Sequence, residues 1–437
     1  MRILLVAPRT DYPGGVPGWL RIPQMSLLIL EALSKNGHQV ITVEEEAEPI
    51  PFDKTWDLVG ITVMTSAAGR AYTLAQRFRE RGVKVVLGGI HPSVLPAEAS
   101  RHADAVLVGE AEGVWPRLLE DAEHHRLQRV YENLKPATLQ VPLVDYRNDR
   151  KSRVPIASPV VASRGCPNGC NFCSVPRIYG RRHRRLPVEQ IIEQVKRSRG
   201  DYVAFLDDNL GANREYAMEL FTALRNLKVK ILGQVAVKFI LDDELFQLAV
   251  AAGLKGIFVG FETVEEKSLQ GLRKSVALAE YGRAIKKCRD AGVMLHGSFI
   301  FGLDEHDATI FGRTLDFILK HKIPSVSAYV LTPYPGTPLF DQVVREGRLL
   351  HRHWGFYDIV TPVFHPARMT LAELAEGYLK FRQSLFGFRS IAQRFFGAVN
   401  PYVYLHLNAA FRRTTIGLRE HYQNYFKWLK EEKGKEP

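Results

Sequence analysis

Three of the four cysteines in this 437-residue chain lie within eight residues of one another. They are Cys166, Cys170 and Cys173, in the run Ser163-Arg-Gly-Cys-Pro-Asn-Gly-Cys-Asn-Phe-Cys-Ser174. Thiolate is the ligand that proteins use for iron–sulfur clusters. Three thiolates hold three irons of a four-iron cube, which leaves the fourth iron open to a chelating small molecule. The two glycines of the run give the backbone the freedom to wrap such a group.

Zinc is the main alternative to a cluster at these cysteines. Structural zinc sites use four nitrogen or sulfur ligands, often supplied by two C-x-x-C pairs. The remaining cysteine, Cys288, stands alone and is expected to be a buried bystander, so His183 would have to complete a zinc set. That alternative stays open, whereas a disulfide framework does not suit a long chain without a secretory signal.

The cysteine spacing, with Phe172 directly before the last cysteine, resembles the radical S-adenosylmethionine (SAM) enzymes. From Met1 to about Arg389, the chain resembles the subgroup that carries an N-terminal cobalamin-binding domain. The resemblance implies a [4Fe–4S] cluster on the three cysteines, with SAM and cobalamin as further cofactors. It also implies an α/β fold, in which a Rossmann-like doubly wound parallel sheet precedes a partial (β/α)6 barrel and a helical C-terminal region.

The composition, 46% hydrophobic and 24% charged residues, is typical of a folded soluble protein. The length predicts two or three domains. No apolar run approaches the roughly 18 residues that span a bilayer. The N-terminus has the pattern of a buried strand rather than a secretory signal. We therefore expect a cytoplasmic enzyme, a location in which thiols stay reduced.

Residues 1–135 alternate short apolar strands with helices, which predicts a parallel doubly wound sheet. The expected strands are Ile3–Ala7, Val40–Val43, Leu58–Met64, Val83–Leu87 and Ala105–Val108. The expected helices are Pro23–Asn36, Ala67–Arg81 and one that begins at Trp115. Sheets of this kind bind ligands beyond the carboxyl ends of their strands.

Small and hydroxylated residues follow three of these strands and resemble the loops around the lower face of cobalamin. The candidate contacts are Thr62, Thr65, Ser66, Gly88, Gly89, Gly109 and Glu110. The Asp-x-His-x-x-Gly motif that ligates cobalt in many cobalamin proteins is absent, and Asp304-Glu-His306 comes nearest but lies in the wrong domain. We therefore expect no cobalt ligand from that motif, and we interpret His91 as a loop residue. A domain that binds no corrinoid stays open. A nucleotide-binding Rossmann domain is disfavoured because no G-x-G-x-x-G follows the first strand.

After a linker at 136–157, residues 158–345 contain six β/α units, as in the incomplete barrel of the family. The expected strands are Val160–Ser163, Tyr202–Leu206, Val235–Phe239, Ile257–Gly260, Leu295–Phe301 and Ser325–Leu331. Barrel chemistry takes place at the carboxyl ends of the strands. Polar residues gather at these ends, and core packing alone does not explain them.

The family resemblance gives these polar residues roles around SAM. It implies the run Asp207-Asp208-Asn209 beside the methionine amine. It also implies Glu262 as a polar contact and Ser298 in a strand motif beside the adenine. Gln234 is expected to face the pocket. The alternative for each carboxylate is a helix cap or a surface group, most strongly for Asp207. The cationic run 179–185 either folds over the cluster, binds an anionic substrate group or forms a solvated loop.

Residues 346–437 form a basic and aromatic C-terminal region. Residues 380–437 hold 11 Lys or Arg against 4 Asp or Glu, and the whole chain has a net charge of +12. Apolar residues recur at helical spacing at Tyr378, Phe381, Leu385, Phe388, Ala392 and Phe395. This pattern suits an interfacial helix at membrane headgroups or a helical cap that closes the barrel, and both stay open. His351 and His353 are expected in a packed loop rather than at a metal.

The resemblance implies a cobalamin-dependent radical SAM enzyme, with C-methyl transfer as the expected reaction. In that chemistry a 5′-deoxyadenosyl radical removes hydrogen from an unactivated carbon, and methylcobalamin supplies the methyl group. The expected partners are a small-molecule or lipid substrate, an electron donor such as flavodoxin or ferredoxin, and the membrane surface at its periphery. The open alternatives are cyclisation, ring contraction or C–C coupling with the same cofactors, and a non-catalytic iron–sulfur or corrinoid protein. Nucleic acid is disfavoured because the chain contains no recognisable RNA module.

Overall fold

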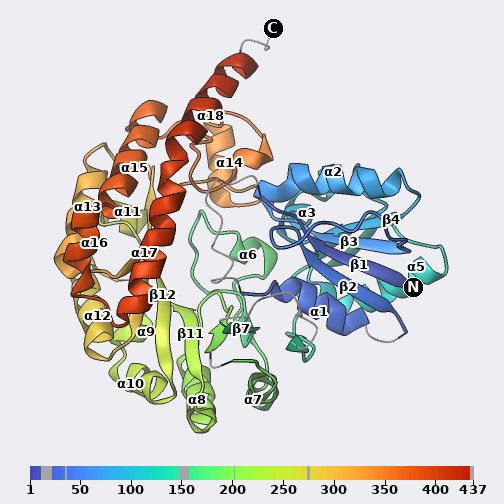
Figure 1. Cartoon of the computed structure of the whole chain (residues 1–437), viewed down its shortest axis with the longest axis horizontal. Coiled ribbons are helices and arrows are strands. Elements are labelled where there is room, and N and C mark those ends of the chain that lie inside the picture. Colours follow the sequence, from blue (N-terminus) through green and yellow to red (C-terminus); the bar gives the residue numbers. More distant parts are fainter. Residues whose placement is uncertain (11–21, 35–36, 147–156, 201, 273–275, 434–437) are drawn as a thin grey trace.

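The structure is a computed structural model, and it shows two parallel sheets side by side with helices around them (Figure 1). The N-terminal sheet lies on one side, the barrel on the other, and the last helices lie over the barrel. The structure describes residues 1–10, 22–34, 37–146, 157–200, 202–272 and 276–433. Most of the second half of the expected linker therefore lies outside the described residues.

The N-terminal sheet has six parallel strands in the order β2-β1-β3-β4-β5-β6. The strands are β1 (Arg2–Ala7), β2 (Gln39–Glu44), β3 (Leu58–Thr62), β4 (Lys84–Gly88), β5 (Ala105–Gly109) and β6 (Val130–Asn133). The helices are α1 (Met25–Ser34), α2 (Ala68–Arg79), α3 (Ile90–Val94), α4 (Pro96–Ala99) and α5 (Trp115–Glu123). Buried apolar clusters lie on both faces, which is why β1 is apolar almost throughout. The doubly wound fold is confirmed, with β6 as an unexpected sixth strand.

The second sheet also has six parallel strands, in the order β14-β13-β12-β11-β10-β7, and forms an open barrel. The strands are β7 (Ala157–Val160), β10 (Tyr202–Phe205), β11 (Lys230–Val235), β12 (Leu254–Glu262), β13 (Met294–Phe301) and β14 (Ser325–Val330). The principal helices outside them are α7 (Val188–Lys196), α8 (Arg214–Leu224), α10 (Asp243–Ala251), α12 (Leu278–Asp290) and α13 (Ile310–His321). Cys288 is fully buried on α12, as expected.

The expected third barrel strand, Val235–Phe239, is wrong in position. The strand is β11, and residues Val237–Leu241 form the short helix α9. Phe239 is buried against the aromatic rings of Phe221 and Phe246. It therefore packs between the helices outside the barrel rather than in the sheet. The true strand was hidden because its apolar run is interrupted by the polar residues Lys230 and Gln234.

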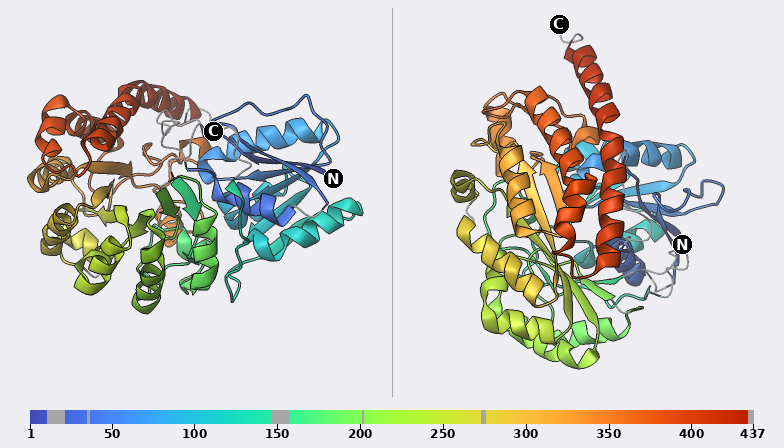
Figure 2. Two further views of the ribbon diagram at one scale, coloured as in Figure 1. Left: turned by 60° about the horizontal axis from the view of Figure 1, so that its bottom comes forward. Right: turned by 60° about the vertical axis from the view of Figure 1, so that its left-hand side comes forward.

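The C-terminal helices pack along the barrel (Figure 2), and the first of them also reaches the N-terminal domain, where its Phe340 joins a core cluster of that sheet. They are α14 (Pro338–Arg345), α15 (Leu371–Leu385), α16 (Phe388–Phe395), α17 (Pro401–Ile416) and α18 (Leu418–Lys433). The stripe expected on one helix is divided between α15 and α16. Tyr378 is buried, and its hydroxyl donates to the Ala328 carbonyl of β14 at 2.6 Å. This first half of the stripe is therefore core, which supports the helical cap.

The loop that contains His351 is packed, as expected. His351 Nε2 lies 3.2 Å from the Tyr425 hydroxyl, and the Trp354 indole N–H donates to Glu98 at 2.8 Å. Among the described residues, no helix is both long and apolar enough to cross a membrane.

Candidate active site

The three cysteines lie in a loop that leaves the barrel and returns to it through a small antiparallel pair. The pair consists of β8 (Ser163–Arg164) and β9 (Arg184–Arg185), and the loop between them includes α6 (Val175–Ile178). Gly165 has a φ of +90°, and a Cβ there would lie 2.3 Å from the Arg182 carbonyl oxygen. Only glycine fits this position, so the loop is closed tightly at its base directly before Cys166.

The cysteine side chains converge inside this loop. The pKa of Cys173 is raised to about 12, mainly by burial and to a lesser degree by the nearby Cys170 and Cys166. Within the described ranges, no three His, Cys, Asp or Glu side chains have the geometry of a single metal-ion site. His183, the candidate fourth zinc ligand, instead lies edge-on to the ring of Tyr216. The three cysteine sulfurs are therefore near one another but are not arranged around a single metal ion. This arrangement fits an iron–sulfur cluster, in which each sulfur binds a different iron atom.

The neighbouring acidic residues Asp207 and Asp208 both border a cavity inside the barrel, but their hydrogen bonds differ. Asp207 is buried and accepts from the Ala162 N–H at 3.1 Å and from the Ser163 hydroxyl. Burial raises the pKa of Asp207 to about 7. Asp208 accepts from the Gly165 N–H at 3.0 Å and borders a cavity inside the barrel. Its pKa is raised by burial.

The other predicted SAM contacts lie around Asp208 to different degrees. Gln234 borders the same cavity and donates to the Asp208 carbonyl at 3.1 Å, as expected for a pocket residue. Asn209 is buried, and its side-chain oxygen accepts from the Ala236 N–H at 3.3 Å. Glu262 has a φ of +66° where the β12–β13 register shifts, and Ser298 is buried on β13. Glu262 and Ser298 do not border the cavity wall, and their roles at SAM stay predictions.

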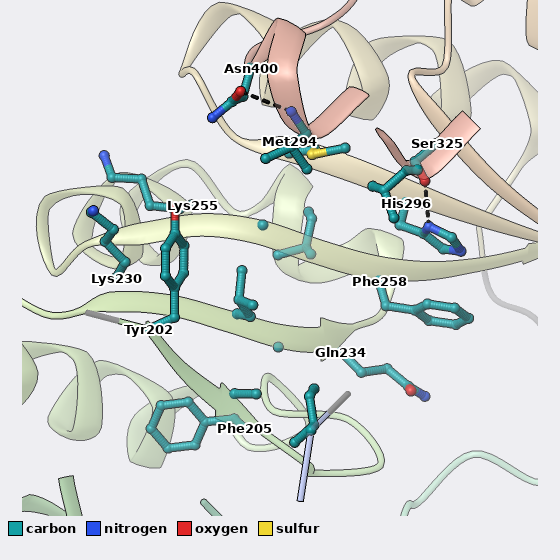
Figure 3. A pocket seen from close by; sticks show the side chains of 18 of the residues that line it. Tyr202, Phe205, Lys230, Gln234, Lys255, Phe258, Met294, His296, Ser325 and Asn400 are labelled. Atoms are coloured by element: carbon teal, nitrogen blue, oxygen red, sulfur yellow. Dashed lines mark hydrogen bonds between the residues drawn. The ribbon is translucent and has the colours of Figure 1, made fainter. Parts of the chain in front are cut away.

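The cavity inside the barrel, here called the barrel cavity, has a volume of about 1320 Å³ (Figure 3). Strands β10–β13 form one wall, and the first half of α17, with Tyr402 and Leu407, forms another. Its middle is apolar, with Phe205, Phe258 and Met294 in the lining. A space of this size and character suits a large apolar molecule.

His296 was not expected in this wall, where it is one of the polar lining residues (Figure 3). Its Nδ1 and Nε2 each lie 2.7 Å from a serine hydroxyl, of Ser325 and Ser327 respectively. The ring stacks on Phe258 with centroids 5.2 Å apart. Burial lowers the pKa of His296 to about 4, so the imidazole is neutral at physiological pH. Alternate residues of a strand face the same side, so the position of His296 between Met294 and Ser298 could have predicted that its side chain faces inward.

The lowered pKa of the half-buried His296 predicts a pH-dependent stability. Because its folded pKa lies below the unfolded value of about 6.5, the stabilisation is complete above that pH and is lost as pH falls towards 4. We expect the wild type to lose about 2 kcal/mol more unfolding free energy between pH 7 and 4 than His296→Asn. Urea titrations at both pH values measure this, with exposed His124→Asn as control. An equal loss in wild type and His296→Asn would contradict the prediction.

A second cavity of about 460 Å³, here called the interdomain cavity, lies between the two sheets. Strands β3–β5 contribute their carboxyl ends, α1 contributes one face, and Arg164, Tyr179 and Leu206 come from the barrel side. The predicted cobalamin contacts that line it are Thr62, Gly88, Gly89, Gly109 and Glu110. Thr65 and Ser66 lie outside the lining, in the short turn Thr65–Ala67, where Thr65 is buried.

The interdomain cavity fits a broad, largely apolar group. Ile22, Met64 and Leu206 around it are 37%, 56% and 43% exposed, although large apolar side chains are normally covered. Gly109 has a φ of +90°, and a Cβ there would lie 2.3 Å from the Asn133 carbonyl oxygen, so only glycine fits at this position of the lining. A corrin ring would cover these surfaces. Leu206 and Ile22 also border the barrel cavity, so the two cavities adjoin.

No histidine is found among the described residues that line the interdomain cavity. The interpretation of His91 as a loop residue is wrong, because it lies in α3 and is fully buried. Its Nε2 lies 3.0 Å from the Tyr72 hydroxyl and 3.3 Å from Glu98. His306, in the Asp304-Glu-His306 run, is also buried, beside Thr263 in the barrel domain.

Glu110 is part of a buried ion network between the two domains. Arg164 donates to Glu110 at 2.8 Å and to Glu112 at 2.7 Å, and Arg184 donates to the other oxygen of Glu110. The side chains of Glu110 and Arg184 are each 3% exposed. Arg164 and Arg184 are opposite each other in the β8–β9 pair, at the base of the cysteine loop. Glu110 therefore joins the corrinoid side to the cluster loop, a role that the sequence did not suggest.

The cationic run also has a mixed outcome. Arg184 pairs with Glu110, while Arg185 lies over the Tyr216 ring at 5.3 Å and is exposed. Arg181 and Arg182 are exposed as well. Only part of the run is therefore a solvated loop, and its buried member serves the domain interface.

Comparison with known proteins agrees with this geometry. The Radical SAM superfamily profile matches residues 160–318, and the B12 binding domain profile matches residues 23–119. Bacteriochlorophyllide d C-8(2)-methyltransferase of Chlorobaculum tepidum is 31% identical over 355 residues, covering 76% of this chain and 79% of the relative. Bacteriochlorophyllide d C-12(1)-methyltransferase of the same organism is 29% identical over 409 residues, covering 90% and 89%.

A solved structure shows the same fold. The cobalamin-dependent SAM radical enzyme OxsB, with aqua-cobalamin and SAM bound, matches with a TM-score of 0.67 at 14% identity. The match covers 97% of this chain and 80% of OxsB. The cysteine loop, the two adjoining cavities and these similarities lead to one conclusion: the chain belongs to the cobalamin-dependent radical SAM methyltransferase family, whose cofactors are a [4Fe–4S] cluster, SAM and cobalamin.

Proposed function

We propose that this enzyme transfers a methyl group to an unactivated carbon of a large, apolar small molecule bound in the barrel cavity. The observation that carries the proposal is the adjoining position of the two cavities, which share Ile22 and Leu206. One end of the barrel cavity is bordered by Asp208 and Gln234 and also adjoins the interdomain cavity. A substrate in the barrel cavity would therefore have one end next to both. Bacteriochlorophyllide, in the names of two relatives, is a large substrate of the kind that the cavity suits.

The bound cofactors supply the radical and the methyl group, and the protein binds, orients and excludes water. Cys166, Cys170 and Cys173 would hold the cluster. Asp208, fixed by the Gly165 N–H, lies beside the cluster loop, where an acceptor for the amine of SAM is needed. The apolar walls of the barrel cavity keep water from a reactive carbon.

Anaerobic reconstitution with iron, sulfide and hydroxocobalamin tests the proposal. One sample gives iron content, the corrinoid spectrum and the 5′-deoxyadenosine formed from SAM under dithionite. Methyl-labelled SAM and a chlorin substrate then show whether the label enters the product. A product without label would indicate cyclisation or coupling instead. About one zinc per chain and no SAM cleavage would overturn the proposal.

We also propose that α16 and the start of α17 contact an anionic membrane surface. In this proposal the protein is cytoplasmic, and flavodoxin or ferredoxin reduces its cluster. Phe388 and Phe396 are 76% and 78% exposed. Arg412 lies 4.3 Å from the Phe388 ring and Lys322 lies 5.7 Å from the Phe396 ring. Exposed aromatics beside cations support interfacial binding.

Vesicle sedimentation tests the membrane contact. We expect more protein to sediment with anionic vesicles than with zwitterionic ones, and the double variant Phe388→Ser, Phe396→Ser to lose most of that binding. Ile41→Ser, an exposed apolar residue on β2, is the matched control. Equal sedimentation of the double variant and wild type would contradict the contact.

A further inference from the structure

Two lysines lie at the end of the barrel cavity that is far from the cysteine loop. Lys230 and Lys255 are near the starts of β11 and β12, and Figure 3 shows both beside the ring of Tyr202. The ammonium group of Lys230 lies 5.0 Å from the centre of that ring. The barrel chemistry expected at the carboxyl ends of the strands does not use these residues.

The position of Lys255 results from an irregularity in the sheet. Ile231 pairs with Leu254 and Leu232 pairs with Gly256, so Lys255 is an extra residue on β12. A bulge of this kind redirects a side chain from its regular alternation. Lys255, which would otherwise alternate with its neighbours, instead reaches the same end of the cavity as Lys230 (Figure 3).

The charges that line the barrel cavity are separated along its length. Among the described lining residues, the acidic ones are Asp207 and Asp208, both beside the cysteine loop, and the lysines are at the opposite end. Apolar side chains, including Leu232 and Phe258, line the space between. Gln234 follows Lys230 by four residue steps along β11, which corresponds to about 13 Å. The cavity thus offers a cationic end, an apolar body and a reactive end.

We infer that the barrel cavity selects an apolar substrate that ends in one anionic group, a carboxylate or a phosphate, and that Lys230 and Lys255 bind this group. The inference rests on the proposed function, because it places the reacting carbon at the Asp208 end. Ammonium groups are compact cations that bind such anions without the fixed geometry an arginine imposes. Binding the anion at the far end sets the depth and direction in which the apolar body enters, so the lysines select which carbon meets the cofactors.

Paired probes on the reconstituted holoenzyme test the inference. One pair is a chlorin monocarboxylic acid and its methyl ester, and the other is hexadecyl phosphate and hexadecanol. Anaerobic equilibrium dialysis gives the Kd of each. We expect wild type to bind at least one acid about 10-fold or more tightly than its neutral counterpart, since charge-assisted contacts are strong. The pair that shows this preference identifies the apolar body.

The double variant Lys230→Gln, Lys255→Gln is expected to lose that preference and to bind the neutral probe unchanged. Lys238→Gln, an exposed lysine on α9 outside the cavity lining, is the matched control and keeps it. Equal binding of acid and neutral probe by wild type, or a preference retained in the double variant, overturns the inference. Formation of 5′-deoxyadenosine, measured without substrate in the same samples, separates the two proposals: its absence in wild type defeats the proposed function, whereas its presence without acid preference defeats only the lysine site.

Discussion

Replacing Cys170 by alanine is expected to abolish cleavage of SAM while cobalamin uptake stays close to that of wild type. The cysteine belongs to the loop between β8 and β9, whereas the predicted corrinoid contacts lie at the carboxyl ends of β3–β5, so the two cofactors are expected to depend on different segments. Replacing a residue that only hydrogen-bonds to a metal ligand typically costs about 10–100-fold in activity. Loss of a cluster ligand itself should cost more, so we expect the rate of SAM cleavage to fall by more than about 100-fold. The measurement is 5′-deoxyadenosine formed under dithionite, with the corrinoid spectrum as second readout.

Cys288→Ala is the matched control for this experiment. Cys288 is fully buried on α12, away from the loop, and its replacement removes one thiol without touching the cluster. The control should retain iron content and SAM cleavage. Cleavage retained in Cys170→Ala would count directly against a cluster on the three cysteines, and cleavage lost in both variants would show that general destabilisation is responsible.

Glu110→Ala is expected to lower the free energy of unfolding by about 3–5 kcal/mol, because it leaves the buried Arg184 without its ion-pair partner, whereas Arg164 keeps its pair with Glu112. Glu110 accepts from Arg164 and Arg184, and the side chains of these arginines are 12% and 3% exposed. Removing one partner of a buried ion pair is costly, since the remaining charges have lost both water and their partner. Urea unfolding followed by circular dichroism measures the change.

An exposed ion pair provides the comparison for Glu110. Asp290 pairs with Lys286 on the surface of α12, with side chains 52% and 68% exposed. Asp290→Ala should cost less than about 1 kcal/mol, because water replaces the lost partner. A similarly small cost for Glu110→Ala would show that the arginines find other acceptors and that the network does not hold the two domains together.

The sequence predicted the fold wherever apolar strands are buried on both faces. This holds for β1 and β5, whose side chains meet helices on either side of the sheet. The prediction fails for β11, because the inward face of that strand borders a cavity. Polar residues such as Lys230 and Gln234 can face a cavity, so the strand lacks a continuous apolar pattern. The neighbouring residues Val237–Leu241 have a more strand-like composition, yet they pack as a helix outside the barrel.

The site was predicted in part, and the missing part depends on contacts between distant segments. The cysteines and Asp208 are adjacent to recognisable local patterns. Glu110 was placed correctly at the carboxyl end of β5, but its partners lie more than 50 residues away, and no local pattern distinguishes a corrinoid contact from an ion pair. His296 was missed for a similar reason, because its two serine partners are on the next strand.

The position of Leu206 in both cavity walls links two properties that are usually tuned separately. A larger or smaller side chain there changes the room for the substrate and the room for the corrinoid at once. Evolution of a new substrate range through this position would therefore require compensating changes at the corrinoid side, and directed evolution should vary Leu206 together with Ile22 and Met64 rather than alone.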